Sequence, residues 1–198
     1  MPFVLTVDQQ GSRRGADRVA GALDLLSGVP VVLRFERTAG DEFQGVLDRP
    51  AAVVDAVVRL VRAGGWSVGV GAGPVQLPLP DSTRAAAGPA FVAARRAVDT
   101  AKHRPVRLAV QGADEEAAAD AQATATVLAL LLQRRSPQAW EAIDLVAAGA
   151  TQAEAAAELG VSRQAVGQRL AAAAWEAEQD LHPVLARLLA RAEGGSRP

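Results

Sequence analysis

Short β-branched runs alternate with helix-like stretches along the first 110 residues, and this alternation limits the possible folds more than any other feature. Apolar residues at spacings of three and four predict helices over 16–27, 50–63 and 84–102. Compact β-branched runs bounded by turn residues predict strands at 3–7, 31–37, 43–47, 66–73 and 106–110. The predicted order is β-α-β-β-α-β-α-β, and its first six elements match a split βαβ unit of the ferredoxin-like kind. We therefore expect an α+β fold with a ferredoxin-like domain over residues 1–112.

The second half of the chain is helical by pattern and forms a separate predicted domain over residues 118–198. The connecting stretch QGADEEAAAD (111–120) is acidic and alanine-rich, which is typical of a linker or a frayed helix start. Residues 119–135 are rich in alanine and leucine and contain no helix breaker. Pro137 then starts a further helix that ends at Gly149. The sequence thus predicts an all-α C-terminal domain.

A helix-turn-helix over residues 151–174 is the clearest local motif, carried by the run TQAEAAAELGVSRQAVGQRL that begins it. Thr151 and Glu154 have the spacing of a capping box. Gly160 permits a sharp turn, and Ser162 suits the N-cap of the second helix. The pattern resembles the helix-turn-helix of sigma-factor region 4 and LuxR-type regulators, which implies double-stranded DNA as a partner. Enzymes also use such helix pairs as structural elements.

The second helix of this motif carries side chains that can read bases. Arginine can donate two hydrogen bonds to guanine, and glutamine can bind adenine in the same bidentate way. Gly167 would let the backbone approach DNA, and Arg169 would contact a phosphate. The predicted DNA-binding residues are Ser162, Arg163, Gln164, Gly167, Gln168 and Arg169.

The charge of the motif indicates that one copy would bind DNA weakly. Residues 150–175 carry two arginines and two glutamates, and affinity for DNA depends largely on neutralised phosphates. We therefore expect a homodimer, which would double the contacts. The apolar stripe at 183–192 is expected to start a helix at Pro183 and to pack on the helix-turn-helix core; the alternative is that it forms the dimer interface.

Three carboxylates are predicted to meet at the tip of a hairpin. Asp41 and Glu42 lie in the run TAGDEFQG (38–45), and Asp8 ends the first strand, which approaches the hairpin in a ferredoxin-like sheet. Clustered carboxylates repel one another unless a cation neutralises them. Oxygen ligands without histidine or cysteine favour Mg²⁺ or Mn²⁺. The alternative is that Asp41 is an ordinary turn residue beside Gly40 and that Glu42 faces water.

A candidate phosphate-binding segment lies close to these carboxylates in sequence. The run GSRRG (11–15) leads into the first predicted helix. Backbone amides at that helix start, together with Ser12, Arg13 and Arg14, could receive phosphate oxygens. The sequence therefore predicts a nucleotide site beside the metal site.

These motifs together resemble the SatD-like family, and the GDEF hairpin resembles the palm of GGDEF proteins and nucleotidyl cyclases. The similar blocks are D-x-x-G-S-R at 8–13, GDEFQG at 40–45, VGVGAG at 68–73 and GPAFVAARRA at 88–97. The resemblance implies that Asp8 and Asp41 hold the metal with Glu42 beside them. It also implies a purine nucleotide as ligand, bound near Gly40, with Arg95 on a phosphate.

Two functions of different classes fit these features. The first is a DNA-binding transcriptional regulator whose cyclase-like domain senses a purine nucleotide with a divalent metal. The second is a metal-dependent nucleotide cyclase or hydrolase with a helical accessory domain, and a third, weaker one is a dimerisation scaffold without a ligand. The first is favoured because Ala39 replaces the first glycine of GGDEF and the chain has no asparagine to read guanine. No catalytic residue is assigned.

Composition excludes several other classes. The chain of 198 residues has no cysteine, so it has no disulfide, thiolate metal site or cysteine nucleophile. No apolar run approaches the ~20 residues of a membrane span. The start MPFVLTVDQQ lacks the basic residues of a secretion signal. We expect a cytoplasmic protein with no membrane partner.

Overall fold

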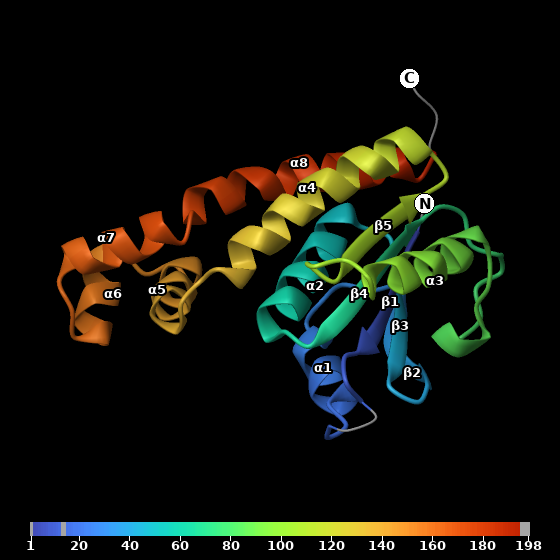
Figure 1. The fold of residues 1–198 in the computed structure, drawn as a ribbon, viewed down its shortest axis with the longest axis horizontal. Coiled ribbons are helices and arrows are strands. Elements are labelled where there is room, and N and C mark those ends of the chain that lie inside the picture. Colours follow the sequence, from blue (N-terminus) through green and yellow to red (C-terminus); the bar gives the residue numbers. More distant parts are fainter. Residues whose placement is uncertain (1, 13–14, 195–198) are drawn as a thin grey trace.

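The computed structural model describes residues 2–12 and 15–194, and its centre is a five-stranded mixed sheet (Figure 1). The strands are β1 (Phe3–Gln9), β2 (Leu33–Ala39), β3 (Glu42–Leu47), β4 (Trp66–Ala72) and β5 (Leu108–Gly112). They lie in the order β2-β3-β1-β4-β5. β1 pairs antiparallel with β3 and β4, β2 pairs antiparallel with β3, and β5 lies parallel to β4. The adjacency of the first and third strands is as the sequence predicts.

Helices cover both faces of this sheet, so the α+β class predicted from the sequence is confirmed. The helices are α1 (Val19–Leu26), α2 (Pro50–Ala63), the short 3-10 helix η1 (Thr83–Ala85), α3 (Pro89–Ala101), α4 (Glu115–Gln133), α5 (Pro137–Ala147), α6 (Gln152–Leu159), α7 (Arg163–Ala172) and α8 (Trp175–Ala192). α1, α2, α4 and α8 share one core with the sheet, and α3 covers the opposite face.

The alternation of side chains along β1 explains this layering. Phe3 and Leu5 point into the core with α2 and α8, whereas Val4 packs with Ala90 and Ala94 of α3. Both faces of β1 are therefore buried, which is why the strand reads as a continuous apolar run.

Glycines in β4 let α3 approach the sheet closely. A Cβ at Gly69 would lie 2.2 Å from the backbone nitrogen of Val98, and one at Gly71 would lie 2.2 Å from the carbonyl oxygen of Ala90. A larger residue at either position would push α3 outward and displace the polar side chains that α3 carries.

α5, α6 and α7 form a smaller core of their own at one end of the molecule, beyond the C-terminal end of α4 (Figure 1). Its buried residues include Ile143, Ala155, Val166 and Leu170. α4 and α8 instead bury their apolar faces in the core of the sheet. The boundary between the two hydrophobic cores therefore lies between α4 and α5 and again near the start of α8. It does not lie at residues 111–120, where the linker was expected.

The expected helix over 84–102 is wrong at its start. η1 ends at Ala85, and α3 begins only at Pro89, because Gly88 has φ 134 and cannot continue a helix. Of the two interpretations of residues 111–120, the linker is wrong and the helix start is confirmed. β5 runs to Gly112, and α4 begins directly after its N-cap, Asp114, whose side chain accepts a hydrogen bond from the Ala117 N–H.

The expected start of the last helix at Pro183 is wrong as well. α8 begins at Trp175 and runs through Pro183 to Ala192. Leu185 and Leu189 of this helix are buried in the main core and not against the core of α5 to α7. The stripe therefore neither packs on the helix-turn-helix core nor stays exposed for a dimer interface.

None of the helices in the described part of the chain is long and apolar enough to cross a lipid bilayer.

Candidate functional site

The pair α6–α7 is held by the caps that the sequence predicts. The Thr151 hydroxyl accepts a hydrogen bond from the Glu154 N–H at 3.2 Å, and the Glu154 carboxylate accepts one from the Thr151 N–H at 2.8 Å. The backbone hydrogen bond from Thr151 lowers the pKa of Glu154. Gly160 ends α6 in the left-handed region with φ 64, and Ser162 Oγ accepts from the Ala165 N–H at 3.1 Å. These interactions fix the angle at which α7 leaves the turn.

α7 turns most of its polar side chains outward. Ser162, Arg163, Gln164 and Gln168 are exposed, while Val166 and Leu170 are buried against α5 and α6. Within residues 2–12 and 15–194, the side chains of Arg163, Gln164 and Gln168 make no hydrogen bond or ion pair. The exposed face therefore has free donors and acceptors.

Two of the predicted DNA-binding residues have a different environment. Gly167 is half-buried, and a Cβ there would lie 3.4 Å from Gln152 Oε1 of α6. Arg169 is turned toward α5, where its Nη1 lies 3.5 Å from the Gln138 carbonyl oxygen and 3.8 Å from a Glu141 carboxylate oxygen. Gly167 thus lies at the contact between the two helices, and Arg169 lies beside the reading face.

A hollow of about 440 Å³ separates α7 from the junction of α4 and α5. Its lining includes Gln168 and Arg169 from α7, and Arg134 and Arg135 from the end of α4. Arg134 is exposed and was missed by sequence reasoning. No local signal could have found it, because it precedes the motif by 17 positions and joins α7 only through the tertiary fold.

Two arginines fix this helical unit to the sheet domain. The ring of Trp140 in α5 contacts the guanidinium groups of Arg62 in α2 and of Arg135, which are 4.3 Å and 4.7 Å from its centre. Arg62 also binds Asp144 through two hydrogen bonds, at 2.5 Å and 2.6 Å, and the Asp144 hydrogen bond raises the pKa of Arg62. α5 therefore cannot rotate on α2 without breaking both interactions.

Arg135 is the more deeply buried of the two anchors. Its Nη1 lies 2.5 Å from Glu178 Oε2 in α8, and its Nε and Nη2 donate to the Ala173 carbonyl oxygen at the end of α7. His182 Nε2 lies 3.1 Å from the other oxygen of Glu178. Burial alone would raise the pKa of Glu178, but His182 and Arg135 outweigh it and hold this pKa below its usual range. The end of α7 is thus tied to α4 and α8 through one buried cation.

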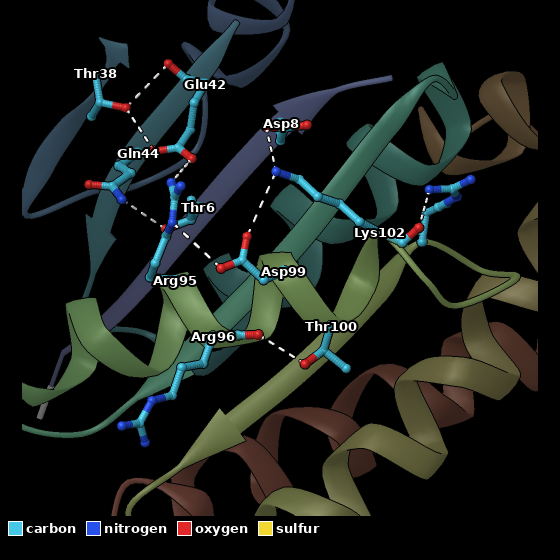
Figure 2. Close-up of polar contacts among 11 residues, drawn as sticks. Thr6, Asp8, Thr38, Glu42, Gln44, Arg95, Arg96, Asp99, Thr100 and Lys102 are labelled. Atoms are coloured by element: carbon cyan, nitrogen blue, oxygen red, sulfur yellow. Dashed lines mark hydrogen bonds and ion pairs between the residues drawn. The ribbon is translucent and has the colours of Figure 1, made fainter. Parts of the chain in front are cut away.

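At the hairpin, the structure brings together two of the three predicted metal ligands. Asp8 is paired with Glu42 across β1 and β3, so both side chains lie on the face that α3 covers. Each carboxylate already faces a cation of α3 or its C-cap. Lys102 Nζ lies 2.9 Å from Asp8, and Arg95 forms an ion pair with Glu42 (Figure 2).

The Glu42 carboxylate has a further partner on the hairpin itself. Thr38 Oγ1 donates to Glu42 Oε1 at 3.0 Å. Asp99 adds a carboxylate 3.7 Å from Arg95 and 3.8 Å from Lys102, which completes a chain of alternating charges along α3 (Figure 2). The expectation that Glu42 faces water is wrong, because this residue is buried.

Asp41 belongs to a separate cavity of about 300 Å³, to which neither Asp8 nor Glu42 contributes. The residues lining it are Gln9, Ser12, Gly15, Asp17, Arg37, Gly40 and Asp41. Arg37 lies 2.5 Å from Asp17, and this hydrogen bond lowers the pKa of the Asp17 carboxyl. Of the predicted nucleotide-binding residues, Ser12 and Gly40 line this cavity, Arg95 does not, and Arg13 and Arg14 lie outside the described residues.

The carboxylates as arranged do not fit a divalent ion. A metal bound by Asp8 and Glu42 would have to displace Lys102 and Arg95, and Asp41 lies in a different cavity. Across the described ranges, no group of three or more acidic or histidine side chains is placed to hold a metal. Mg²⁺ or Mn²⁺ at this hairpin stays a prediction from the sequence, and no step below is derived through it.

Comparison with known proteins gives no relative. No family model matches the chain, and neither a curated protein nor a solved structure matches it. The functional argument therefore rests on the geometry of the two sites.

Proposed function

We propose that this protein is a DNA-binding transcriptional regulator in which α6 and α7 form a helix-turn-helix and α7 is the recognition helix. The observation that carries the proposal is the exposed, unpaired row of Arg163, Gln164 and Gln168 on a helix whose start is fixed by Ser162. These side chain types make bidentate contacts with guanine and adenine.

The hollow beside α7 supports the same function. Arg134 and Arg169 line this hollow beside α7, and we expect them to contact a DNA phosphate, because phosphate contacts set the register of a protein on DNA. Because the motif itself has no net charge, Arg134 supplies part of the positive potential that the motif lacks.

The sheet domain is proposed to sense a purine nucleotide. Its strand order is that expected of a ferredoxin-like, cyclase-like palm, extended by β5. The hairpin cavity of about 300 Å³ offers Ser12, Gly40 and Arg37 to a phosphate group, and Arg37 would exchange its partner Asp17 for that phosphate on binding. Nucleotide binding would change DNA affinity only by its difference in affinity for two states of the protein.

Two experiments test this function. In the first, purified protein selects duplexes from a random DNA library, and enrichment of a common motif is the expected result; no enrichment would contradict DNA reading.

In the second, the protein is incubated with Mg²⁺ and each NTP, followed by thermal unfolding and chromatography. A raised midpoint without turnover is expected for a sensor, whereas turnover would show the alternative, a cyclase or hydrolase.

A further inference from the structure

α4 is apolar on both of its sides. One side is buried in the main core through residues such as Leu128 and Leu132. The other side carries Ala123, Val127 and Leu130, and the last two are 49% and 47% exposed. Aliphatic side chains that lie together on an exposed helix face mark an association surface, so the outward side of the second half of α4 is expected to have a partner.

A groove of about 1190 Å³ continues this apolar surface toward α3. Val110 and Ala118 are part of its lining, and Val92 on the α3 side is 52% exposed. The groove follows β5, which is the last strand of the sheet. A groove lined by exposed aliphatic side chains is a typical association surface.

Gln122 decides how a partner can bind in this groove. Its Oε1 accepts from the Val110 N–H at 2.8 Å, and its Nε2 donates to the Leu108 carbonyl oxygen at 3.4 Å. These backbone groups are the ones that an added strand would need. The partner must therefore pack through side chains, as a helix does, and not as a further strand.

The two ends of the groove carry charges of opposite sign. α4 starts at the C-terminal end of β5, so Glu115 and Glu116 lie at that end. Arg104 precedes β5, and Arg96 lies in the second half of α3, so both belong to the opposite end. In the described part of the chain, neither arginine side chain forms an ion pair, and Figure 2 shows Arg96 apart from the network of Arg95.

A surface with an acidic end, an apolar middle and a basic end complements itself when it is turned by 180°. We propose that a second copy of this chain docks here, with the two α4 helices antiparallel and the two-fold axis near Ala123. Glu115 and Glu116 of one copy then lie toward Arg96 and Arg104 of the other, twice, around a centre formed by Ala119, Ala123 and Val127 of both copies. This inference goes beyond DNA reading, because the oligomeric state is measured without DNA.

The test reverses the sign of the charge at one end of the groove at a time. The basic-end variant is Arg96→Glu/Arg104→Glu, and the acidic-end variant is Glu115→Arg/Glu116→Arg. Light scattering after size exclusion should give about twice 20.4 kDa for the wild type at tens of micromolar, and the monomer mass for each variant alone. Mixing the two variants in equal amounts should restore the dimer, because every opposed pair is then attractive.

The controls separate this proposal from its competitors. Arg187→Glu, on the exposed side of α8, changes the charge outside the groove and should leave the dimer intact. If the charge variants do not fold by circular dichroism, Val127→Glu at the exposed centre replaces them and should give a monomer. A monomeric wild type, dimeric variants, or a mixture that stays monomeric would overturn the proposal; a monomer whose melting midpoint rises with an amphipathic carboxylate such as laurate would assign the groove to a ligand instead.

Discussion

Arg163 is the single side chain on which the DNA-reading hypothesis depends most. It is the first residue of α7, directly after the Ser162 cap, and its guanidinium is exposed and unpaired among the described residues. Arg163→Ala should weaken binding to a selected duplex by about 1–3 kcal/mol and relax the base preference at one position. Fluorescence anisotropy on the selected duplex and on a scrambled one measures both effects. Arg187→Ala removes an exposed arginine from α8 and should leave the affinity unchanged; equal losses in the two variants would mean that α7 contributes charge alone.

Arg134 is expected to act differently, because it lines the hollow beside α7 and not the outward row. Arg134→Ala removes a cation that would bind a phosphate, so it should weaken binding to all sequences by a similar factor. The slope of log affinity against log salt concentration should then fall by about one unit. A titration from low to moderate salt, on both selected and scrambled duplexes, measures this. An unchanged slope would place DNA away from the hollow.

At the scale of elements, helix boundaries that depend on prolines and capping residues could be predicted from the sequence. The boundaries of α2, α5, α6 and α7 follow from Pro50, Pro137, the capping box at Thr151 and the Ser162 cap, and each is where the sequence places it. The approach of Asp8 to the hairpin also follows from the strand order, whereas its register opposite Glu42 is known only from the structure.

The elements that the sequence could not predict depend on interactions between distant residues. A proline inside a helix costs about 3 kcal/mol or more, so Pro183 was expected to begin a helix. Burial of Leu185 and Leu189 against the main core, at about 1.5–3 kcal/mol each, offsets that cost in α8. The family resemblance placed Arg95 near the hairpin, but its ion pair with Glu42 and that of Lys102 with Asp8 were not predicted, since ion-pair partners distant in sequence leave no local pattern.

Glu178 tests how α7 is joined to α4 and α8. Glu178→Gln leaves Arg135 buried without a counter-charge, and the decrease in free energy of unfolding at pH 7 should be about 3–5 kcal/mol. The folded pKa of Glu178 lies below the ordinary value of 4.5. Its stabilising charge is therefore fully present above pH 4.5 and is lost as the pH falls through the folded pKa. The difference between variant and wild type should narrow below pH 4.5.

Urea unfolding at several pH values measures this difference. Glu176→Gln changes an exposed carboxylate on the same helix, so it is the matched control and should have little effect. A difference between Glu178→Gln and wild type that stays constant through the acidic range would contradict the role of the Glu178 charge.

For the whole molecule, the proposed dimer sets the spacing of its DNA half-sites. With the two-fold axis near Ala123, the C-terminal ends of the two α4 helices lie about 30 Å apart, from ten residues on each side at 1.5 Å per residue. α7 lies beyond that end of α4 in each copy (Figure 1). The recognition helices are then separated by more than one turn of B-DNA, about 34 Å. Footprinting on selected DNA should show half-sites two turns apart, and half-sites one turn apart would rule out the α4 interface.

The measurement that tests the central claim most directly is a change of specificity at one residue. Wild type and Arg163→Gln each select duplexes from the same random library, and the two enriched motifs are compared. If α7 reads bases, one guanine of the wild-type motif should become an adenine, because glutamine pairs with adenine as arginine does with guanine. An identical motif from both proteins would contradict the assignment of α7 as the recognition helix.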